Sequence, residues 1–327
     1  MSKYIVGIDG GGTKTAFIIV DDIGNIIAHH TEGTCSYLAI GIENSRHVLE
    51  NGIKILLQKS NSHLSDIKFT FFGLPSFGED QKMETVLNDL PSSMFASETY
   101  SCGTDAICGW AGSLACADGI NIVAGTGSMS YGEYKDKKVR VGGWGELFSD
   151  EGSAYKIACD GLNVFTKMSD GRLDHGPLYE ILKTHLSLET DMNLSGIILD
   201  NWDGDRGKIA SLSKVMHAAA IAGDKQIIDI FNRSGEELAN IIDTTKYRLG
   251  FPSSMITNLS YSGGVFNADE FILNPLKSAL KSKYNIVKPR FSPVVGAALY
   301  AAKQYGFLHD EKALFTLEKQ EKKFLSR

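Results

Sequence analysis

Positive charge, paired cysteines and long apolar runs are all scarce in this sequence, and each shortage excludes a class of protein. The formal net charge of -6 leaves no basic surface to attract nucleic acid nonspecifically or to favour an anionic membrane. No apolar run approaches the length of a membrane-spanning helix. The cysteines are odd in number and lack a disulfide or metal spacing, so we expect reduced thiols: Cys35, Cys102, Cys108, Cys116 and Cys159.

Length and composition fit a globular protein of two domains. The chain has 327 residues, of which 43% are hydrophobic and 22% charged. It begins Met-Ser-Lys and enters a strand-like run at once, so we expect no signal peptide and a cytoplasmic protein.

One local pattern occurs twice. Residues 4 to 20 are two apolar runs around a glycine-rich turn, followed by a third apolar run at 26–28. Residues 120 to 132 repeat this order around Gly-Thr-Gly, and a further strand is expected at 139–141. The repeat indicates two halves built on one plan; the alternative is coincidence between two hairpins.

The other elements are predicted from apolar spacing and turn residues. They include strands at 69–74 and 255–259, and helices at 45–57, at 227–247 and from Pro293. The charged tail from Glu311 is expected to fray. Strands gathered in two places, with helices around them, predict an α/β protein.

The first turn has the composition of a phosphate-binding loop. Gly10, Gly11 and Gly12 let backbone N–H groups converge on a phosphate, while Thr13, Lys14 and Thr15 add hydroxyl donors and a positive charge. Asp9, at the strand end, is placed to hold Mg²⁺. The spacing fits neither a P-loop nor a dinucleotide fingerprint. The alternative is an ordinary hairpin turn.

Two further glycine turns lie downstream. Gly125, Thr126, Gly127 and Ser128 offer a second phosphate cradle, and Gly263 and Gly264 would let the backbone approach an adenine or ribose. Taken alone, each is as easily a simple turn.

Two aspartates are candidates for catalysis or substrate binding. Asp105, in Gly103-Thr104-Asp105, either caps a helix or accepts a proton from a substrate hydroxyl. Asp150 either caps the next helix or binds sugar hydroxyls. Trp144, among glycines at 142–145, either packs in a core or touches a ligand.

Together and in order, these segments resemble the actin-like ATPase superfamily of sugar kinases, Hsp70 and actin. The matching segments are GIDGGGTKT, GTDA, AGTGS, GGWG, DEGSAY, the Ser-Gly-Gly turn and a Pro-x-x-Gly-Ala-Ala helix, and they span residues 7 to 298. More narrowly, they resemble the N-acetylglucosamine kinase-like branch of the BadF/BadG/BcrA/BcrD ATPase family. The resemblance implies two actin-like (ribonuclease H-like) lobes, each a mixed sheet flanked by helices, with an ATP cleft between them.

The resemblance also implies domain boundaries and residue roles. The lobes would cover residues 1–115 and 116–292, with a helix at 293–310 packing back on the first. Asp9 would serve the metal, the three glycine turns the nucleotide, and Asp105 would be the catalytic base. The implied sugar contacts are Ser36, Ser76, Thr104, Gly143, Trp144 and Asp150. Cys102–Thr104, Thr34–Ser36 and Ser149 depart from the family pattern, which puts the identity of the sugar in doubt.

The implied activity is ATP- and Mg²⁺-dependent phosphorylation of a small amino sugar, first of all N-acetylglucosamine to its 6-phosphate. Alternatives are a kinase of N-acetylmuramic acid or glucosamine, and an iron–sulfur ATPase activator of a 2-hydroxyacyl-CoA dehydratase or benzoyl-CoA reductase-type enzyme, which Cys102 and Cys116 keep open. A third alternative is a nucleotide-dependent scaffold or chaperone. A chaperone of this kind needs an appended domain, for which we expect no room in this chain. No nucleic-acid or membrane partner is expected, and the resemblance is compatible with a homodimer.

Overall fold

The computed structural model describes residues 4–325 and divides the chain into two compact units. Unit 1 comprises the chain up to Asn121 together with the segment from Val287 onward, and unit 2 is Ile122–Ile286. The boundaries expected from the sequence, after residues 115 and 292, lie a few residues from these positions. Within the described range, no helix is both long and apolar enough to cross a membrane.

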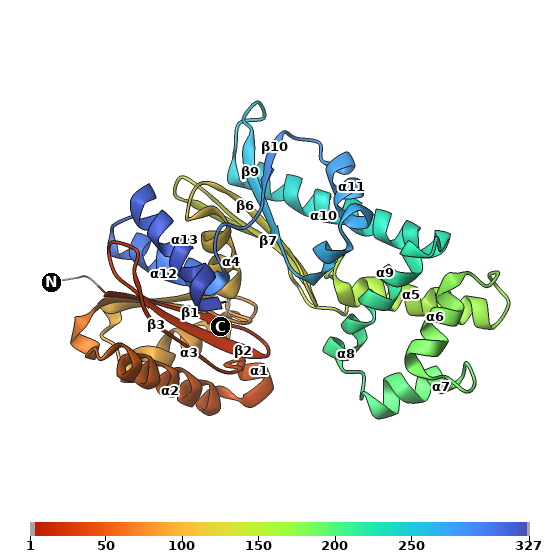
Figure 1. The fold of residues 1–327 in the computed structure, drawn as a ribbon, viewed down its shortest axis with the longest axis horizontal. Coiled ribbons are helices and arrows are strands. Elements are labelled where there is room, and N and C mark those ends of the chain that lie inside the picture. Colours follow the sequence, from red (N-terminus) through yellow and green to blue (C-terminus); the bar gives the residue numbers. More distant parts are fainter. Residues whose placement is uncertain (1–3, 326–327) are drawn as a thin grey trace. The chain divides into compact units, whose positions relative to one another are not determined.

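Unit 1 contains a five-stranded mixed sheet in the order β3-β2-β1-β4-β5 (Figure 1). The strands are β1 (Tyr4–Gly10), β2 (Lys14–Val20), β3 (Ile26–Gly33), β4 (Ile67–Leu74) and β5 (Tyr100–Thr104). The first three strands pair antiparallel, whereas β1, β4 and β5 run parallel. Asp9 is in register with Gly73, and Gly73 with Gly103, so the carboxyl ends of the parallel strands share one edge.

Helices cover both faces of this sheet. On one face lies α2 (Ile42–Ser60), whose buried stripe of Leu49, Ile53 and Leu56 follows helical spacing. On the other lie α4 (Asp105–Leu114) and α12 (Pro293–Tyr305). A Cβ at Gly296 would lie 2.1 Å from the Cys108 carbonyl oxygen, so α12 approaches α4 this closely only with glycine there. Shorter elements are α1 (Tyr37–Ile40), η1 (Leu64–Asp66), α3 (Gln81–Asp89), η2 (Leu90–Ser93) and η3 (Ser97–Thr99).

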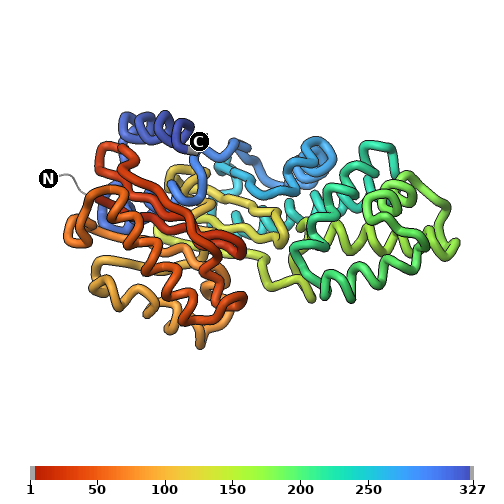
Figure 2. Tube along the Cα trace, turned by 60° about the horizontal axis from the view of Figure 1, so that its bottom comes forward, coloured from red at the N-terminus to blue at the C-terminus, as the bar shows by residue number. Residues whose placement is uncertain are grey.

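The tail that was expected to fray is instead a helix, α13 (Glu311–Leu325), lying along the N-terminal strands (Figure 2). It buries Leu314 and Leu317, and the Gln320 side chain accepts a hydrogen bond from the Ile26 N–H at 2.7 Å. The high charge of this segment conceals an apolar stripe at helical spacing, which explains why the prediction was wrong.

Unit 2 contains a second five-stranded sheet, in the order β10-β9-β6-β7-β8. Its strands are β6 (Gly119–Ala124), β7 (Ser128–Tyr134), β8 (Lys137–Gly142), β9 (Thr257–Ser262) and β10 (Tyr284–Val287). Numbered from its own first strand, each sheet reads 3-2-1-4-5. This shared order confirms the expectation of two halves on one plan and excludes coincidence between two hairpins.

Helices make up most of the rest of unit 2 (Figure 1). The long α10 (Lys225–Leu249) packs on β7 and β8 and ends at the left-handed Gly250. The remaining elements are α5 (Ala154–Ser169), α6 (Pro177–Leu186), α7 (Asn193–Ser195), the π-helix η4 (Gly196–Asn201), α8 (Arg206–Ser211), α9 (Ser213–Ile221), η5 (Gly264–Ala268) and α11 (Glu270–Ala279).

Candidate functional site

Asp9 and Asp105 lie at the shared strand edge of unit 1. Asp9 is the penultimate residue of β1, and Asp105 is the first residue of α4, directly after β5. The helix cap is Thr104, whose hydroxyl oxygen accepts the Ala106 N–H at 3.4 Å. The interpretation of Asp105 as the N-cap is therefore wrong, and its carboxylate remains a candidate for chemistry.

The two carboxylates influence each other. Burial, and then the negative charge of Asp105, raise the pKa of Asp9 to about 7, although a hydrogen bond with the Cys108 side chain and the charge of Lys14 lower it in part. Two carboxylates this close need a proton or a cation between them. Across residues 4–325, no three His, Cys, Asp or Glu side chains form a group able to hold a metal.

The predicted phosphate turn joins β1 to β2. Its Gly11 N–H donates to the Lys14 carbonyl at 2.9 Å, and the Thr34 hydroxyl donates to the Gly11 carbonyl at 2.8 Å. Gly12, Thr13 and Lys14 are exposed at its tip. Thr15 is fully buried and donates its hydroxyl to the Gly33 carbonyl at 2.9 Å, so it is not available as a phosphate donor.

Ser36 and Ser76, two of the predicted sugar contacts, are also in unit 1. Ser36 is buried and precedes α1, and its N–H donates to the Thr34 hydroxyl. Ser76 follows β4 in a left-handed conformation with φ 60°, which is uncommon for a residue other than glycine. Such conformations gather at functional turns, which is consistent with a role for Ser76.

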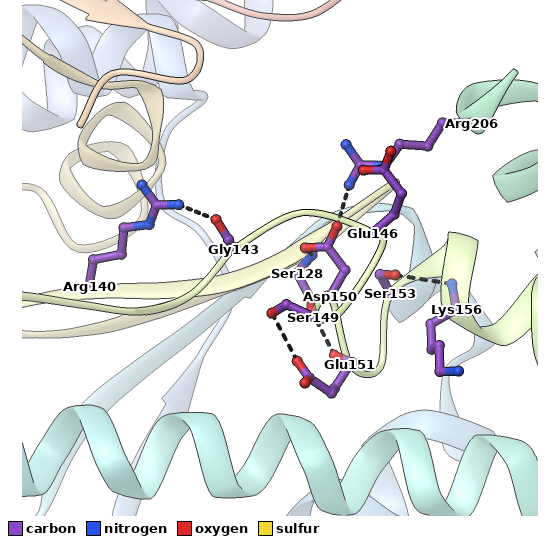
Figure 3. A network of polar contacts seen from close by, with 10 residues as sticks. All are labelled: Ser128, Arg140, Gly143, Glu146, Ser149, Asp150, Glu151, Ser153, Lys156 and Arg206. Atoms are coloured by element: carbon purple, nitrogen blue, oxygen red, sulfur yellow. Dashed lines mark hydrogen bonds and ion pairs between the residues drawn. The ribbon is translucent and has the colours of Figure 1, made fainter. Parts of the chain in front are cut away.

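In unit 2 the turn Gly125–Ser128 is held by the loop that precedes α5 (Figure 3). The Gly125 carbonyl accepts the Ala154 N–H at 2.8 Å. The Ser128 N–H donates to Asp150 Oδ1 at 3.2 Å, and the Ser128 hydroxyl donates to the Glu151 carbonyl at 2.6 Å. The turn is therefore fixed in shape by contacts within its own unit.

Asp150 is nearly fully buried, and its second oxygen forms an ion pair with the Arg206 guanidinium (Figure 3). Burial raises the pKa of Asp150, whereas the Ser128 N–H and Arg206 act to lower it. The cap of α5 is Ser153, whose hydroxyl oxygen accepts the Lys156 N–H, so Asp150 does not cap that helix. Arg206 belongs to no local motif, so its place beside Asp150 could not be predicted from the sequence.

A pocket of about 510 Å³ opens beside this turn, entirely within unit 2. Gly125, Thr126, Gly207 and Gly264 line it together with α9 and η5. A Cβ at Gly263 would lie 2.3 Å from the Ala124 carbonyl oxygen, and its φ is 107°, so the two glycine turns meet closely. The volume is in the usual range for small-molecule sites. Its full lining is Gly125, Thr126, Ala154, Ile157, Gly207, Ala210, Ser211, Ser213, Lys214, His217, Phe231, Gly264, Val265, Asn267 and Ala268.

The segment from Gly142 to Ser149 contains only half-buried and exposed residues. Trp144 is 76% exposed, and Leu147 and Phe148 are also on the surface, so the core-packing interpretation of Trp144 is wrong. The Gly143 carbonyl accepts a hydrogen bond from the Arg140 guanidinium. An exposed aromatic ring beside an anchored carbonyl suits contact with a ligand.

Two sheets of order 3-2-1-4-5, each with a glycine turn after its first strand, define an actin-like ATPase fold of the sugar-kinase type. The chain matches the BadF/BadG/BcrA/BcrD ATPase family over residues 6–301, and it belongs to that family.

Relatives of known name agree with this placement. The chain is 28% identical to N-acetyl-D-glucosamine kinase of Dictyostelium discoideum, over 92% of this chain and 98% of that protein. It is 27% identical to N-acetylmuramic acid/N-acetylglucosamine kinase of Clostridium acetobutylicum, over 88% and 93% respectively. A solved structure from Chromobacterium violaceum has the same fold, with a TM-score of 0.70, 21% identity and coverage of 91% of this chain and 98% of that one.

Proposed function

We propose that this protein transfers the terminal phosphate of ATP to a hydroxyl of an amino sugar, with N-acetylglucosamine and its 6-position as the first choice. The observation that carries the proposal is the pair Asp9 and Asp105 beside an exposed glycine turn, where burial and then the charge of Asp105 raise the pKa of Asp9. A kinase needs one carboxylate for a metal and another for the attacking hydroxyl. The names of the two relatives, both kinases of amino sugars, support the same reaction.

In this proposal Asp105 orients the sugar hydroxyl and accepts its proton. Thr104 lies beside it, with its hydroxyl 3.2 Å from Asp105 Oδ1. Asp9 would hold Mg²⁺, which when bound neutralises charge on the transferred phosphate. In unit 1, Gly10, Gly12, Thr13 and Lys14 would donate to phosphate oxygens. Gly11, through its bond to Lys14, and Thr15, through its bond to Gly33, would support that turn.

Unit 2 supplies the remaining nucleotide contacts. We assign the amides of Thr126 and Gly127 to the phosphates, within a turn that the N–H groups of Gly125 and Ser128 hold in shape. The adjoining pocket, with Gly263 and Gly264 at its edge, is assigned to the adenosine. The sugar contacts would be Ser36, Ser76 and Thr104 from unit 1, with Gly143, Trp144 and Asp150 from unit 2.

N-acetylmuramic acid remains a second candidate acceptor, since the name of the Clostridium relative includes it, and glucosamine is a third. Among the residues that the structure describes, the surroundings of Cys102 and Cys116 do not favour an iron–sulfur activator. Cys116 is buried, and burial raises the pKa of the Cys102 thiol well above its ordinary value. A cluster shared between two copies needs thiolates at the surface.

The test is ADP release with Mg²⁺ and ATP across N-acetylglucosamine, N-acetylmuramic acid, glucosamine, N-acetylmannosamine and glucose. We expect one amino sugar to stimulate ADP release strongly. Its 6-deoxy analogue is the matched control, since it should compete for binding without being phosphorylated. Slow ATP hydrolysis that no sugar alters would overturn the proposal.

A further inference from the structure

Arg206 joins two carboxylates of one loop. It is the first residue of α8, and its side chain is 39% exposed. One guanidinium nitrogen forms the ion pair with buried Asp150, and Nε lies 3.3 Å from Glu146 Oε2 (Figure 3). The planar fork of arginine suits such a double contact, whereas the ammonium group of lysine is a single point charge.

The same guanidinium lies against the phosphate turn. A Cβ at Gly127 would be 2.7 Å from Arg206 Nη2 and 3.0 Å from both Asp150 oxygens. Asp150 in turn accepts the Ser128 N–H at 3.2 Å. Gly207, the next residue along α8, lines the pocket together with Gly125 and Thr126. Arg206 therefore lies against the proposed phosphate turn and is next in the chain to a residue that lines the pocket.

Glu146 extends this network to the exposed loop. It is two residues beyond Trp144, within the segment 142–149 that carries the proposed sugar contacts Gly143 and Trp144. Asp150 has φ 63°, a conformation that a residue other than glycine keeps only when its surroundings hold it. The hydrogen bond from Ser128 and the ion pair with Arg206 stabilise this conformation.

We propose that Arg206 is a positioning residue that couples the nucleotide turn to the acceptor loop. Through Asp150 it fixes the Ser128 amide, and through Glu146 it fixes the segment 142–149. This inference rests on the proposed function and adds to it one side chain on which the binding of both substrates depends. Removing Arg206 would leave the buried Asp150 charge without its cation, which is costly inside a protein.

The test uses Arg206→Gln, Arg206→Lys and Glu146→Gln in the full chain. The matched control is Arg172→Gln, because Arg172 also pairs with an aspartate of unit 2, Asp170, on an exposed surface. For each variant we would measure the Kd for ADP by calorimetry, the KM for the sugar, the unfolding midpoint, and hydrogen exchange of amides 142–149.

We expect Arg206→Gln to raise both the Kd for ADP and the KM for the sugar about tenfold, because it loses the charged hydrogen bond to Asp150 and the ion pair with Glu146. Arg206→Lys should recover the Kd to within about threefold of wild type while the KM stays raised, because lysine cannot serve both carboxylates. Glu146→Gln should raise only the KM and the exchange of amides 142–149. Arg172→Gln should change none of these.

An Arg206→Gln protein with a raised Kd but an unchanged KM and unchanged loop exchange would overturn the coupling. So would equal recovery of both constants by lysine. A wild-type protein that binds ADP but phosphorylates no sugar would instead refute the proposed function. In that case the Kd and the exchange of amides 142–149 still decide the role of Arg206.

Discussion

The two units share a sheet order but differ in the groups that face their key carboxylates, Asp9 in unit 1 and Asp150 in unit 2. In unit 1, Asp9 faces the charge of Asp105, and its pKa rises to about 7. In unit 2, burial also raises the pKa of Asp150, yet a backbone N–H and a guanidinium act against that rise. The first arrangement calls for a cation from outside the chain, and the second already contains one.

This difference assigns different tasks to two similar turns. The unit 1 turn is open at Gly12, where an added Cβ would meet nothing within 4 Å. The unit 2 turn is crowded at Gly127 by Arg206 and Asp150. We infer that chemistry and metal belong to unit 1, whereas unit 2 holds the nucleotide on a rigid frame.

The largest effect is expected for Asp105→Asn, which tests whether unit 1 carries the chemistry. If unit 1 carries the chemistry, the loss of the proton acceptor should lower kcat about 10²- to 10⁴-fold with sugar present. The Kd for ADP should remain near that of wild type, because the proposed adenosine pocket lies in unit 2. Near-normal turnover by this variant would refute the assignment of the base.

The next largest effect is expected at Asp9. Asp9→Asn should raise the Mg²⁺ concentration needed for half-maximal rate about 10- to 100-fold, because the amide carries no charge. The matched change in unit 2, Asp150→Asn, should leave the Mg²⁺ requirement unaltered. An equal shift in both variants would contradict the division of tasks.

The raised pKa of Asp9 also predicts a pH dependence of stability. Between its ordinary value of 3.8 and about 7, the folded protein keeps a proton on Asp9 that the unfolded chain releases. The contribution of this proton to the free energy of unfolding is fully present below the ordinary pKa and is lost as the pH rises through about 7. Without divalent ions, the melting temperature of the wild type should fall relative to Asp9→Asn between about pH 5 and about pH 8, and Mg²⁺ should narrow the gap.

Much of the fold was readable from the sequence because its signals are local. The hairpin around the first glycine turn, its repeat near Gly125, and the long helix ending before Gly250 all follow from apolar spacing and turn residues. The same repeat predicted two halves on one plan, but the order of strands within each sheet came only from the structure. The tail helix was missed because charge outweighed its buried Leu314 and Leu317 in the composition.

Candidate site residues could be predicted only where one residue type limits the chemistry. The glycines before Thr13 and the aspartate at a strand end were predicted because few other residue types could bind a phosphate or a metal there. Arg206 could not be predicted, because its partner Asp150 is 56 positions earlier and only the folded loop brings the two together. Thr15 was misjudged as a donor, since the pairing of β2 with β3 directs its hydroxyl to Gly33.

A smaller effect should separate a phosphate cradle from a simple turn. Gly12→Ala places a methyl group in open space, so the free protein should unfold at the wild-type midpoint. A phosphate approaching the Gly12 amide would meet that methyl group, and the Kd for ATP should rise about tenfold. Gly33→Ala, which also meets nothing within 4 Å, is the matched control for stability and binding. An unchanged Kd in Gly12→Ala would favour the ordinary hairpin turn.

The smallest expected effect concerns the exposed face of unit 2. Trp144 packs against little in the protein, so Trp144→Ala should leave the unfolding midpoint unchanged. If its ring touches the sugar, the KM for the sugar should rise about fivefold, the worth of one aromatic contact. Tyr247→Ala removes another exposed ring of the same unit, 84% exposed, and should change neither quantity. An equal KM for Trp144→Ala and wild type would contradict the proposed contact of Trp144 with the sugar. The proposed link between segment 142–149 and the nucleotide would then rest on Arg206 alone.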